Sequence, residues 1–331
     1  ATASLSNETE APTTLTGALS QRATAALATS AAALAAAPAP AASFVRLVRA
    51  YTVWRSKNTF CCWGHLMTGP TEDVGPNSCA WLLIALPIVV FTVMWGPVFF
   101  TAHLRYWVFV NLSFVSVIFW FLVTSFTDPG ILPRGEPPKT PPQAVRYRTV
   151  ENGDQLREFW CYTCNIYRPE GASHCRDCDN CVLDFDHHCP FTRNCIGARN
   201  YSSFILFLTS TNFGLALILV GLLILAPSFH LTVMPIRFAG IDLGGLLNAM
   251  LIVYSILLVV LLGLFNGYHL SLVVAGLTTR EHLKGKDIRK RGLCDRFRCA
   301  ACDASQIKPR QLVEVENKPN VPIPVISMSQ L

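Results

Sequence analysis

The chain has 331 residues, of which 51% are hydrophobic and 15% charged, so it is too apolar for an ordinary soluble protein of this length. Its net charge of +6 fits a protein face that lies near anionic lipid, and no nucleic-acid partner is needed to explain it.

The chain begins with a stretch, 1–43, that is rich in alanine, threonine and serine and is interrupted by Pro38 and Pro40. Alanine is too weakly apolar to hold a membrane span, and the stretch has no aromatic residue, so a disordered tail is predicted in preference to a signal sequence. Residues 44–79 are predicted to be a cytosolic segment next to the membrane. Within it, 44–57 mixes apolar residues with arginine and lysine, which indicates either an amphipathic segment on the inner leaflet or a solvated stretch.

Four strongly apolar stretches contain no charged residue, and each holds the roughly 20 apolar residues that cross a bilayer. They are 74–104, 106–127, 200–236 and 243–279. Spans are predicted near 80–100, 106–126, 204–226 and 246–266, which gives one helical pair over 80–127 and a second over 204–279. The last apolar stretch is longer than a membrane requires, so its helix is expected to continue into the cytosol.

The orientation follows from the positions of lysine and arginine. With four spans, both termini and the central loop share one side, and that side carries 25 of the 27 basic residues. Only Arg105 and Arg237 lie opposite. Because basic residues concentrate on the cytosolic side of membrane proteins, both termini and the loop are predicted to be cytosolic. The reducing cytosol keeps cysteines available to a metal and argues against a disulfide framework.

The central loop, 128–203, starts with a proline-dense, extended part and then becomes rich in cysteine. Between 161 and 195 it contains seven cysteines and three histidines. They are Cys161, Cys164, His174, Cys175, Cys178, Cys181, His187, His188, Cys189 and Cys195. The recurring Cys-x2-Cys spacing lets a tight turn present two thiolates to one tetrahedral zinc. Because the loop has few aliphatic residues, 161–203 is predicted to be a domain of short hairpins and turns that folds with its metal.

Counting the candidate ligands raises the possibility that the cluster is catalytic and not only structural. Two structural zinc ions take eight of the ten candidate ligands and leave two. If these two are a cysteine and a histidine, a thiol lies beside a base, which is the minimum needed for an activated nucleophile. Asp186 next to His187 adds a carboxylate that orients such a base. Counting alone leaves a catalytic and a purely structural cluster about equally open.

The remaining features of the second half are less specific. His269, in apolar sequence, is predicted to be a buried structural histidine. Residues 280–331 carry eleven of the basic residues and are predicted to form a basic cytosolic tail.

Around the cysteine cluster the sequence resembles the DHHC protein S-acyltransferases, or palmitoyltransferases. The signature is carried by Asp186-His187-His188-Cys189-Pro190, Asn194-Cys195, Gly197 and Asn200-Tyr201. Arg168-Pro169, Ser173-His174-Cys175, Asp128-Pro129-Gly130 and Thr278-Thr279-Arg280-Glu281 match as well. The resemblance covers roughly residues 55 to 285 and is strongest to the Ras-acylating branch, whose members work with a small accessory subunit.

The resemblance implies a division of the ten ligands. One zinc would take Cys161, Cys164, His174 and Cys181, and the other would take Cys175, Cys178, His188 and Cys195. Cys189 would then be the nucleophile, His187 the general base, and Asp186 the group that fixes its tautomer. The motif Thr278, Thr279 and Glu281 implies that Thr279 helps to hold Asp186.

The resemblance also implies a function and an architecture. The expected protein is an all-α polytopic membrane protein with four transmembrane helices and a cytosolic two-zinc domain, in the Golgi or endoplasmic reticulum membrane. It would transfer a palmitoyl or similar chain from acyl-CoA, through Cys189, to cysteines of membrane-associated proteins, Ras-like GTPases being one possible substrate. A small accessory subunit is a further expected partner.

Some positions depart from the family pattern, and two other functions stay open. Glu170 and Gly171 stand where the family has a proline and an arginine, and Phe191 stands where it has a tryptophan. Thr192-Arg193 also replaces commoner neighbours. None of these is a predicted ligand or reacting group, so the departures favour altered activity over none. The alternatives are a catalytically weak family member and a membrane-bound zinc module of ubiquitin-ligase type, which leaves Asp186, His187 and Cys189 unexplained.

Overall fold

The computed structural model describes residues 44–149, 153, 155–228, 232, 236–285 and 312–317. One small unit is built around the pairing of strands β1 (Phe44–Arg49) and β13 (Leu312–Asn317). The other described elements belong to a larger unit, which contains every residue discussed below. The tail predicted over 1–43 and most of the tail predicted over 280–331 lie outside the described residues.

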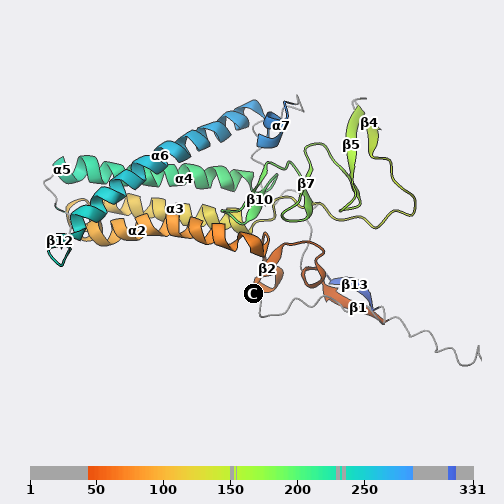
Figure 1. The fold of residues 1–331 in the computed structure, drawn as a ribbon, viewed down its shortest axis with the longest axis horizontal. Helices are drawn as coiled ribbons and strands as arrows, with labels where there is room; N and C mark the ends of the chain where they lie inside the picture. Colours follow the sequence, from red (N-terminus) through yellow and green to blue (C-terminus); the bar gives the residue numbers. More distant parts are fainter. Residues whose placement is uncertain are drawn as a thin grey trace, which may run out of the picture. The chain divides into compact units, whose positions relative to one another are not determined.

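Four helices of the described chain are long and apolar enough to cross a membrane. They include α2 (Val74–Ala102), α3 (Leu104–Phe126), α4 (Tyr201–Val220, continued by the π-helix η4, Gly221–Leu225) and α6 (Leu243–Ala275). They run alongside one another, and the strands of the cysteine-rich part lie at one end (Figure 1). The expected class, a polytopic helical membrane protein with a cysteine-rich domain of short strands, is confirmed.

The helices extend beyond the minimum that the bilayer requires. With 33 residues, α6 is about 50 Å long, whereas a hydrocarbon core is about 30 Å thick. It continues nine residues past the predicted end of the span, as its long apolar stretch suggests, and ends at Gly276 in a left-handed conformation with φ of 69°. A capped five-residue helix, α7 (Thr279–Leu283), follows directly.

Aromatic side chains hold the helices together on the side away from the strands. Phe91 and Phe99 of α2 are fully buried and pack with Phe114 of α3 and Leu251 of α6. Lipid tails are as apolar as these side chains, so close packing rather than water exclusion drives such contacts. A few hydrogen bonds add to it, including the 3.0 Å bond from Trp95 Nε1 to Asn248 Oδ1 between α2 and α6.

The cysteine-rich part consists of short antiparallel strand pairs. The pairs are β5 (Gln155–Cys161) with β4 (Val145–Thr149) and β6 (Ile166–Arg168), β7 (Ser173–Cys175) with β8 (Asn180–Val182), and β9 (His187–Cys189) with β10 (Asn194–Ile196). No strand here exceeds seven residues. Pairs this short are marginal by themselves, so the side chains between them must supply the stability.

The segment before the first membrane helix packs against this cysteine-rich part. Strands β2 (Thr59–Cys61) and β3 (Leu66–Thr68) form a hairpin, followed by the short helix η3 (Thr71–Asp73). Phe60 and Met67 of the hairpin are buried in one cluster with Cys175, Cys178 and Cys195. The Trp54 ring packs edge-on against Phe60, with centroids 5.1 Å apart. This part of the membrane-proximal segment is therefore built into the domain.

The proline-dense start of the central loop also lies along the domain. The backbone N–H of Leu132 donates to the carbonyl of Cys181 at 2.8 Å, and that of Gly135 donates to the carbonyl of Cys164 at 2.9 Å. The loop is therefore a hydrogen-bonded part of the domain.

Candidate active site and metal clusters

The first cluster brings together Cys161, Cys164, His174 and Cys181. Antiparallel register places His174 of β7 directly opposite Cys181 of β8, so their side chains project from the same face. Cys161 ends β5, and Cys164 follows in the turn. His174 Nδ1 lies 3.6, 3.5 and 3.8 Å from the sulfur atoms of Cys161, Cys164 and Cys181.

The second cluster brings together Cys175, Cys178, His188 and Cys195. His188 of β9 lies directly opposite Cys195 of β10. The Nδ1 atom of His188 lies 3.5 Å from the sulfur of Cys178 and 3.6 Å from the sulfur of Cys195. All six cysteines of the two clusters are buried.

Both clusters fit zinc. A tetrahedral ion with Zn–S bonds of about 2.3 Å and Zn–N bonds of about 2.0–2.1 Å holds its sulfur and nitrogen ligands about 3.6 Å apart. In each cluster the four ligand atoms lie within 4.8 Å of one another, and the nitrogen–sulfur separations lie between 3.5 and 3.8 Å. Each set is three cysteines and one histidine, a donor set typical of structural zinc. Each cluster could therefore hold one ion.

The two sets interleave because neighbouring residues of a strand face opposite sides. His174 belongs to the first cluster and Cys175, the next residue of β7, belongs to the second. The same alternation separates His188, which faces the second cluster, from His187 and Cys189 on either side of it in β9. His187 and Cys189 therefore stand together, outside both clusters.

A carboxylate holds His187, and a backbone amide in turn holds that carboxylate. Its Nδ1 donates to Asp186 Oδ2 at 2.9 Å, which leaves Nε2 as the other nitrogen of the ring. The Asp186 side chain is fully buried and its Oδ1 accepts a 2.9 Å hydrogen bond from the backbone N–H of Thr279. Asp186 is in addition anchored by its own N–H, which donates to the carbonyl of Ile196.

The residues Thr278 and Glu281 place this amide. The Thr278 hydroxyl accepts from the N–H of Glu281 at 3.1 Å, and the Glu281 carboxylate accepts from the N–H of Thr278 at 2.9 Å. This reciprocal pair is a capping box, which fixes the first turn of α7. Thr279, the first residue of α7, then presents its N–H to Asp186.

The electrostatics of the three residues agree with an ion pair. Burial alone would lower the pKa of His187, but its hydrogen bonds and charge interactions with Asp186 and Cys189 raise it to about 9. Burial alone would raise the pKa of the Cys189 thiol, but His187 and Thr192 hold it below the usual 9.0. Burial also opposes ionisation of Asp186, yet His187 and Thr279 lower its pKa to about 2. The His187 imidazolium and the Asp186 carboxylate therefore shift Cys189 toward the thiolate relative to a free cysteine.

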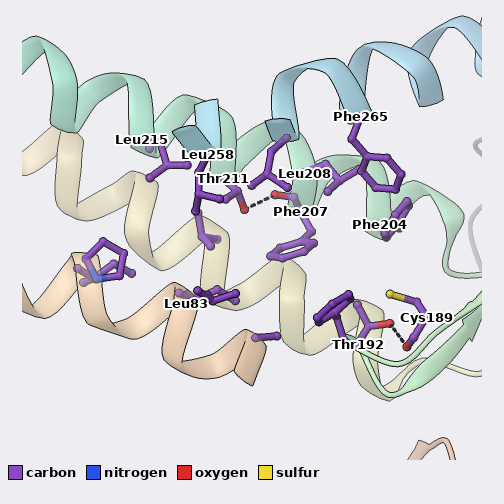
Figure 2. A pocket seen from close by; sticks show the side chains of 18 of the residues that line it. Leu83, Cys189, Thr192, Phe204, Phe207, Leu208, Thr211, Leu215, Leu258 and Phe265 are labelled. Carbon is purple, nitrogen blue, oxygen red and sulfur yellow. Dashed lines mark hydrogen bonds between the residues drawn. The ribbon is translucent and has the colours of Figure 1, made fainter. Parts of the chain in front are cut away.

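Cys189 lies at one end of a long apolar cavity. The cavity has a volume of about 510 Å³ and is lined by α2, α3, α4 and α6 and by the β9–β10 loop. Figure 2 shows the sulfur of Cys189 beside Phe204, with Phe207 and Leu208 beyond it and Leu215 and Leu258 further along the helices. The cavity therefore runs from the thiol into the layer that the membrane helices span.

Several residues of the site carry no local signal in the sequence. Asp73 accepts a 2.7 Å hydrogen bond from His188 Nε2, although 115 residues separate the two. Asp179 lies 3.5 Å from His174 Nε2 at the first cluster. His269 is buried, as predicted, but its ring packs 5.9 Å from that of His187. The apolar stretch around His269 suggested a structural role only.

Three of the positions that depart from the family pattern make contacts or adopt a conformation that explains the residue found there or its role in the fold. Gly171 has a φ of 78°, a conformation that favours glycine over any side chain, so arginine at this position would be strained. Phe191 lines the cavity, and its carbonyl accepts a 2.7 Å hydrogen bond from Asn77 of α2. Arg193 takes part in contacts with the β2–β3 hairpin that are described below.

The four apolar helices define a multi-pass membrane protein. The domain at one end of them has two Cys/His clusters of the kind that binds zinc. The family model for the DHHC palmitoyltransferases matches residues 155–286. Palmitoyltransferase ZDHHC18-B of Danio rerio is 35% identical over 75% of this chain and 67% of its own length. ZDHHC18 of Mus musculus is 34% identical over 74% of this chain and 67% of its own length. This chain belongs to the DHHC palmitoyltransferase family.

The chain spans only part of several relatives. It covers 56% of ZDHHC18-A of Danio rerio, with 34% identity over 75% of this chain. It covers 28% of ZDHHC8 of Homo sapiens, with 36% identity over 66% of this chain.

Proposed function

We propose that the protein is a protein S-acyltransferase. It transfers a long-chain acyl group, palmitoyl or similar, from acyl-CoA through a thioester on Cys189 to a cysteine thiol of a membrane-associated protein. One observation carries the proposal: the Cys189 thiol lies outside both metal clusters, beside the His187–Asp186 pair and at the end of an apolar cavity.

In the first half-reaction, the Cys189 thiolate attacks the thioester carbonyl of acyl-CoA. A carbon–sulfur bond to Cys189 forms, and the bond between the carbonyl carbon and the CoA sulfur breaks. The departing CoA thiolate takes the proton held on Nε2 of His187. Asp186 stabilises the imidazolium through Nδ1 and keeps the ring oriented, as the carboxylate does in other nucleophile–histidine pairs.

In the second half-reaction, an acceptor thiol replaces CoA. His187, now neutral, takes the proton of that thiol, and the resulting thiolate attacks the carbonyl of the Cys189 thioester. The acyl group leaves on the acceptor, and the Cys189 thiolate is restored beside the imidazolium. One thioester replaces another in each step, so the transfer needs no ATP.

The cavity gives the acyl chain a place out of water. About 0.8 kcal/mol favours the burial of each methylene, so a chain of palmitoyl length gains on the order of 10 kcal/mol. A volume of about 510 Å³ lies within the roughly 300–1,000 Å³ range of small-molecule sites. The Cys189 end would receive the thioester while the CoA moiety stays in the cytosol.

Zinc ions, when bound by the two Cys/His sets, supply structural crosslinks for the short strands. The ligand roles are part of the proposal: Cys161, Cys164, His174 and Cys181 for one ion, and Cys175, Cys178, His188 and Cys195 for the other. Thr278, Thr279 and Glu281 act as supporting residues, because the capping box holds the amide that binds Asp186.

The wider setting follows the distribution of charge. The basic side of the membrane helices faces the cytosol, where acyl-CoA is found, and this orientation puts Cys189 on the side of its donor. A Golgi or endoplasmic reticulum membrane, Ras-like substrates and a small accessory subunit stay predictions. Acyl labelling with and without a co-expressed accessory subunit tests the last of them.

The test is acylation of the purified protein in lipid nanodiscs with an alkyne analogue of palmitoyl-CoA. A hydroxylamine-sensitive label on Cys189 is expected, and Cys189→Ser should lose it while still binding two zinc ions per chain. Cys79→Ser removes an exposed thiol outside the site and serves as the matched control. Loss of one zinc ion from Cys189→Ser would overturn the division between ligands and nucleophile.

The same experiment separates the alternatives. A zinc module of ubiquitin-ligase type binds both ions and takes no label. A weak transferase takes the label on Cys189 but passes it slowly to an acceptor thiol. The coupling of Cys189 to His187 and Asp186 favours the active enzyme.

A further inference from the structure

The contact between Asp73 and His188 joins the start of the first membrane helix to the second metal cluster. We propose that Asp73 is a positioning residue: its carboxylate fixes the tautomer and ring orientation of the metal ligand His188, and thereby the strand that carries Cys189. The effect on Cys189 rests on the proposed function, whereas the effect on metal binding does not.

The tautomer follows from the two nitrogens of His188. Nδ1 faces the sulfur atoms of Cys178 and Cys195 at 3.5 and 3.6 Å, so it is the nitrogen that binds a metal and must carry no proton. The neutral ring then carries its proton on Nε2, which donates to Asp73 Oδ2 at 2.7 Å. Both side chains are largely buried, with 10% and 14% exposed, so water competes little for this bond.

Such a carboxylate behind a ligating histidine orients the ring and makes it a stronger ligand. Asp73 does this from a segment that precedes both the first membrane helix and the central loop in the sequence, because it is the last residue of η3 and directly precedes α2. The hydrogen bond therefore joins the helix and the cluster, which are far apart in the chain.

The loop that follows Cys189 is held by the same segment. The Thr68 hydroxyl and the Gly69 amide both donate to the carbonyl of Arg193, at 2.7 and 2.6 Å. Arg193 Nε returns a 2.8 Å hydrogen bond to the carbonyl of Pro70. A Cβ atom on Gly69 would lie 2.7 Å from the Arg193 carbonyl oxygen, so this close approach requires glycine.

These bonds and the Asp73 bond act on the same hairpin. His188 lies within β9, immediately before Cys189, and Arg193 lies immediately before β10. The segment 68–73 thus holds the β9–β10 hairpin at two points, one on each side of the nucleophile. Losing the Asp73 bond frees the ring of His188 and loosens the strand next to Cys189.

The first cluster provides an internal comparison. His174 Nε2 also faces a carboxylate, that of Asp179, but the two atoms lie 3.5 Å apart, and Asp179 lies in the turn that joins β7 to β8, close to His174 in the sequence. The Asp179 carboxylate also forms an ion pair with Arg134, in which Nη2 lies 2.7 Å from Oδ2. The longer, shared contact predicts that the first cluster depends less on its carboxylate than the second does.

The experiment measures zinc affinity of the full-length protein in lipid nanodiscs by competition with a chromophoric chelator. Asp73→Ala should weaken one of the two zinc ions by about 10- to 100-fold, the usual effect of removing such a partner, and leave the other unchanged. Alkylation mapping should show Cys175, Cys178 and Cys195 becoming reactive first. Asp73→Asn keeps the size of the side chain and an acceptor oxygen, and should give a smaller effect.

The controls are Glu72→Ala and Asp179→Ala. Glu72 is a neighbouring carboxylate with 65% of its side chain exposed, so its removal should leave both zinc ions as in the wild type. Asp179→Ala should instead make the cysteines of the first cluster more reactive to alkylation, by a smaller factor than Asp73→Ala produces at the second cluster. If Asp73→Ala fails to fold, Asp73→Asn carries the same comparison.

Two outcomes overturn the inference. Wild-type affinity for both zinc ions in the folded Asp73 variants would remove the role in metal binding. A weakened second zinc with an unchanged rate of Cys189 labelling would remove the role in positioning the nucleophile. Absence of labelling in the wild-type protein would refute the transferase instead, and the zinc measurement would still decide the role of Asp73.

Discussion

The far end of the cavity should set the length of acyl chain that the enzyme accepts. Leu215 of α4 is buried, lines the cavity and lies eleven residues beyond Phe204, which packs near Cys189. At 1.5 Å per residue, this separation is about 16 Å along the helix. Leu215→Trp places a larger ring there and should shorten the space for the chain.

The size of the effect can be estimated from the buried methylenes. If the indole displaces the last three or four methylenes of a palmitoyl chain, at about 0.8 kcal/mol each, the loss is about 3 kcal/mol. That corresponds to a roughly 100-fold change in preference from the sixteen-carbon chain toward a twelve-carbon chain. Any general destabilisation by overpacking, about 1–3 kcal/mol, affects both donors alike and cancels in the ratio.

The assay is competition between twelve- and sixteen-carbon acyl-CoA, with mass spectrometry of the label on Cys189. Leu206→Trp is the matched control, because Leu206 lies on the same helix but is 41% exposed and outside the cavity. An unchanged ratio in Leu215→Trp would show that the acyl chain does not reach this part of the cavity.

Three further predictions concern the site itself. Cys178→Ser should lose metal and folding together by metal analysis and circular dichroism, whereas Cys189→Ser should lose only the label. His187→Ala removes the group that lowers the pKa of Cys189, so the pH at which iodoacetamide alkylation of Cys189 reaches half its maximum should rise; an unchanged midpoint would refute the ion pair. Thr278→Ala removes a capping bond, which costs about 1 kcal/mol at the start of α7. It should slow Cys189 labelling without changing zinc content, and a wild-type rate would contradict the role given to the Thr279 amide.

Part of the site could be read from the sequence because it is local. The spacing of cysteines and histidines predicts two four-ligand sets, and counting predicts that two side chains remain. The alternation of a β-strand explains why the remaining pair is separated by a ligand: His187 and Cys189 flank His188 and face the other way. Counting alone did not settle which residues remain, because that depends on which strands pair.

Other parts depend on contacts between distant segments. Nothing near Asp73 indicates a partner 115 residues away. Long charge-free apolar stretches predict four helices and their approximate bounds, but the cavity depends on how the helices pack. The stretch 44–57 mixes apolar and basic residues, which fits a membrane surface or a solvated stretch, and nothing in this pattern indicates that Phe60 and Met67 of the following hairpin are buried against the second cluster.

Hydrogen bonds from the β9–β10 hairpin to the end of a membrane helix fix where the Cys189 thiol lies. The last carbonyls of a helix have no partner within it, and the Asn194 side chain donates to those of Thr124, Ser125 and Thr127 at the end of α3. Apolar replacement would remove this donor from the carbonyls of Ser125 and Thr127, at about 1–3 kcal/mol for each group left unpaired, whereas the carbonyl of Thr124 also accepts from the Asn200 side chain. Since Asn194 pairs directly with Cys189 across the β9–β10 hairpin, the same contact sets the position of the thiol relative to the end of α3. The metal clusters can shape the hairpin, but its placement at the opening of the cavity depends on the helices.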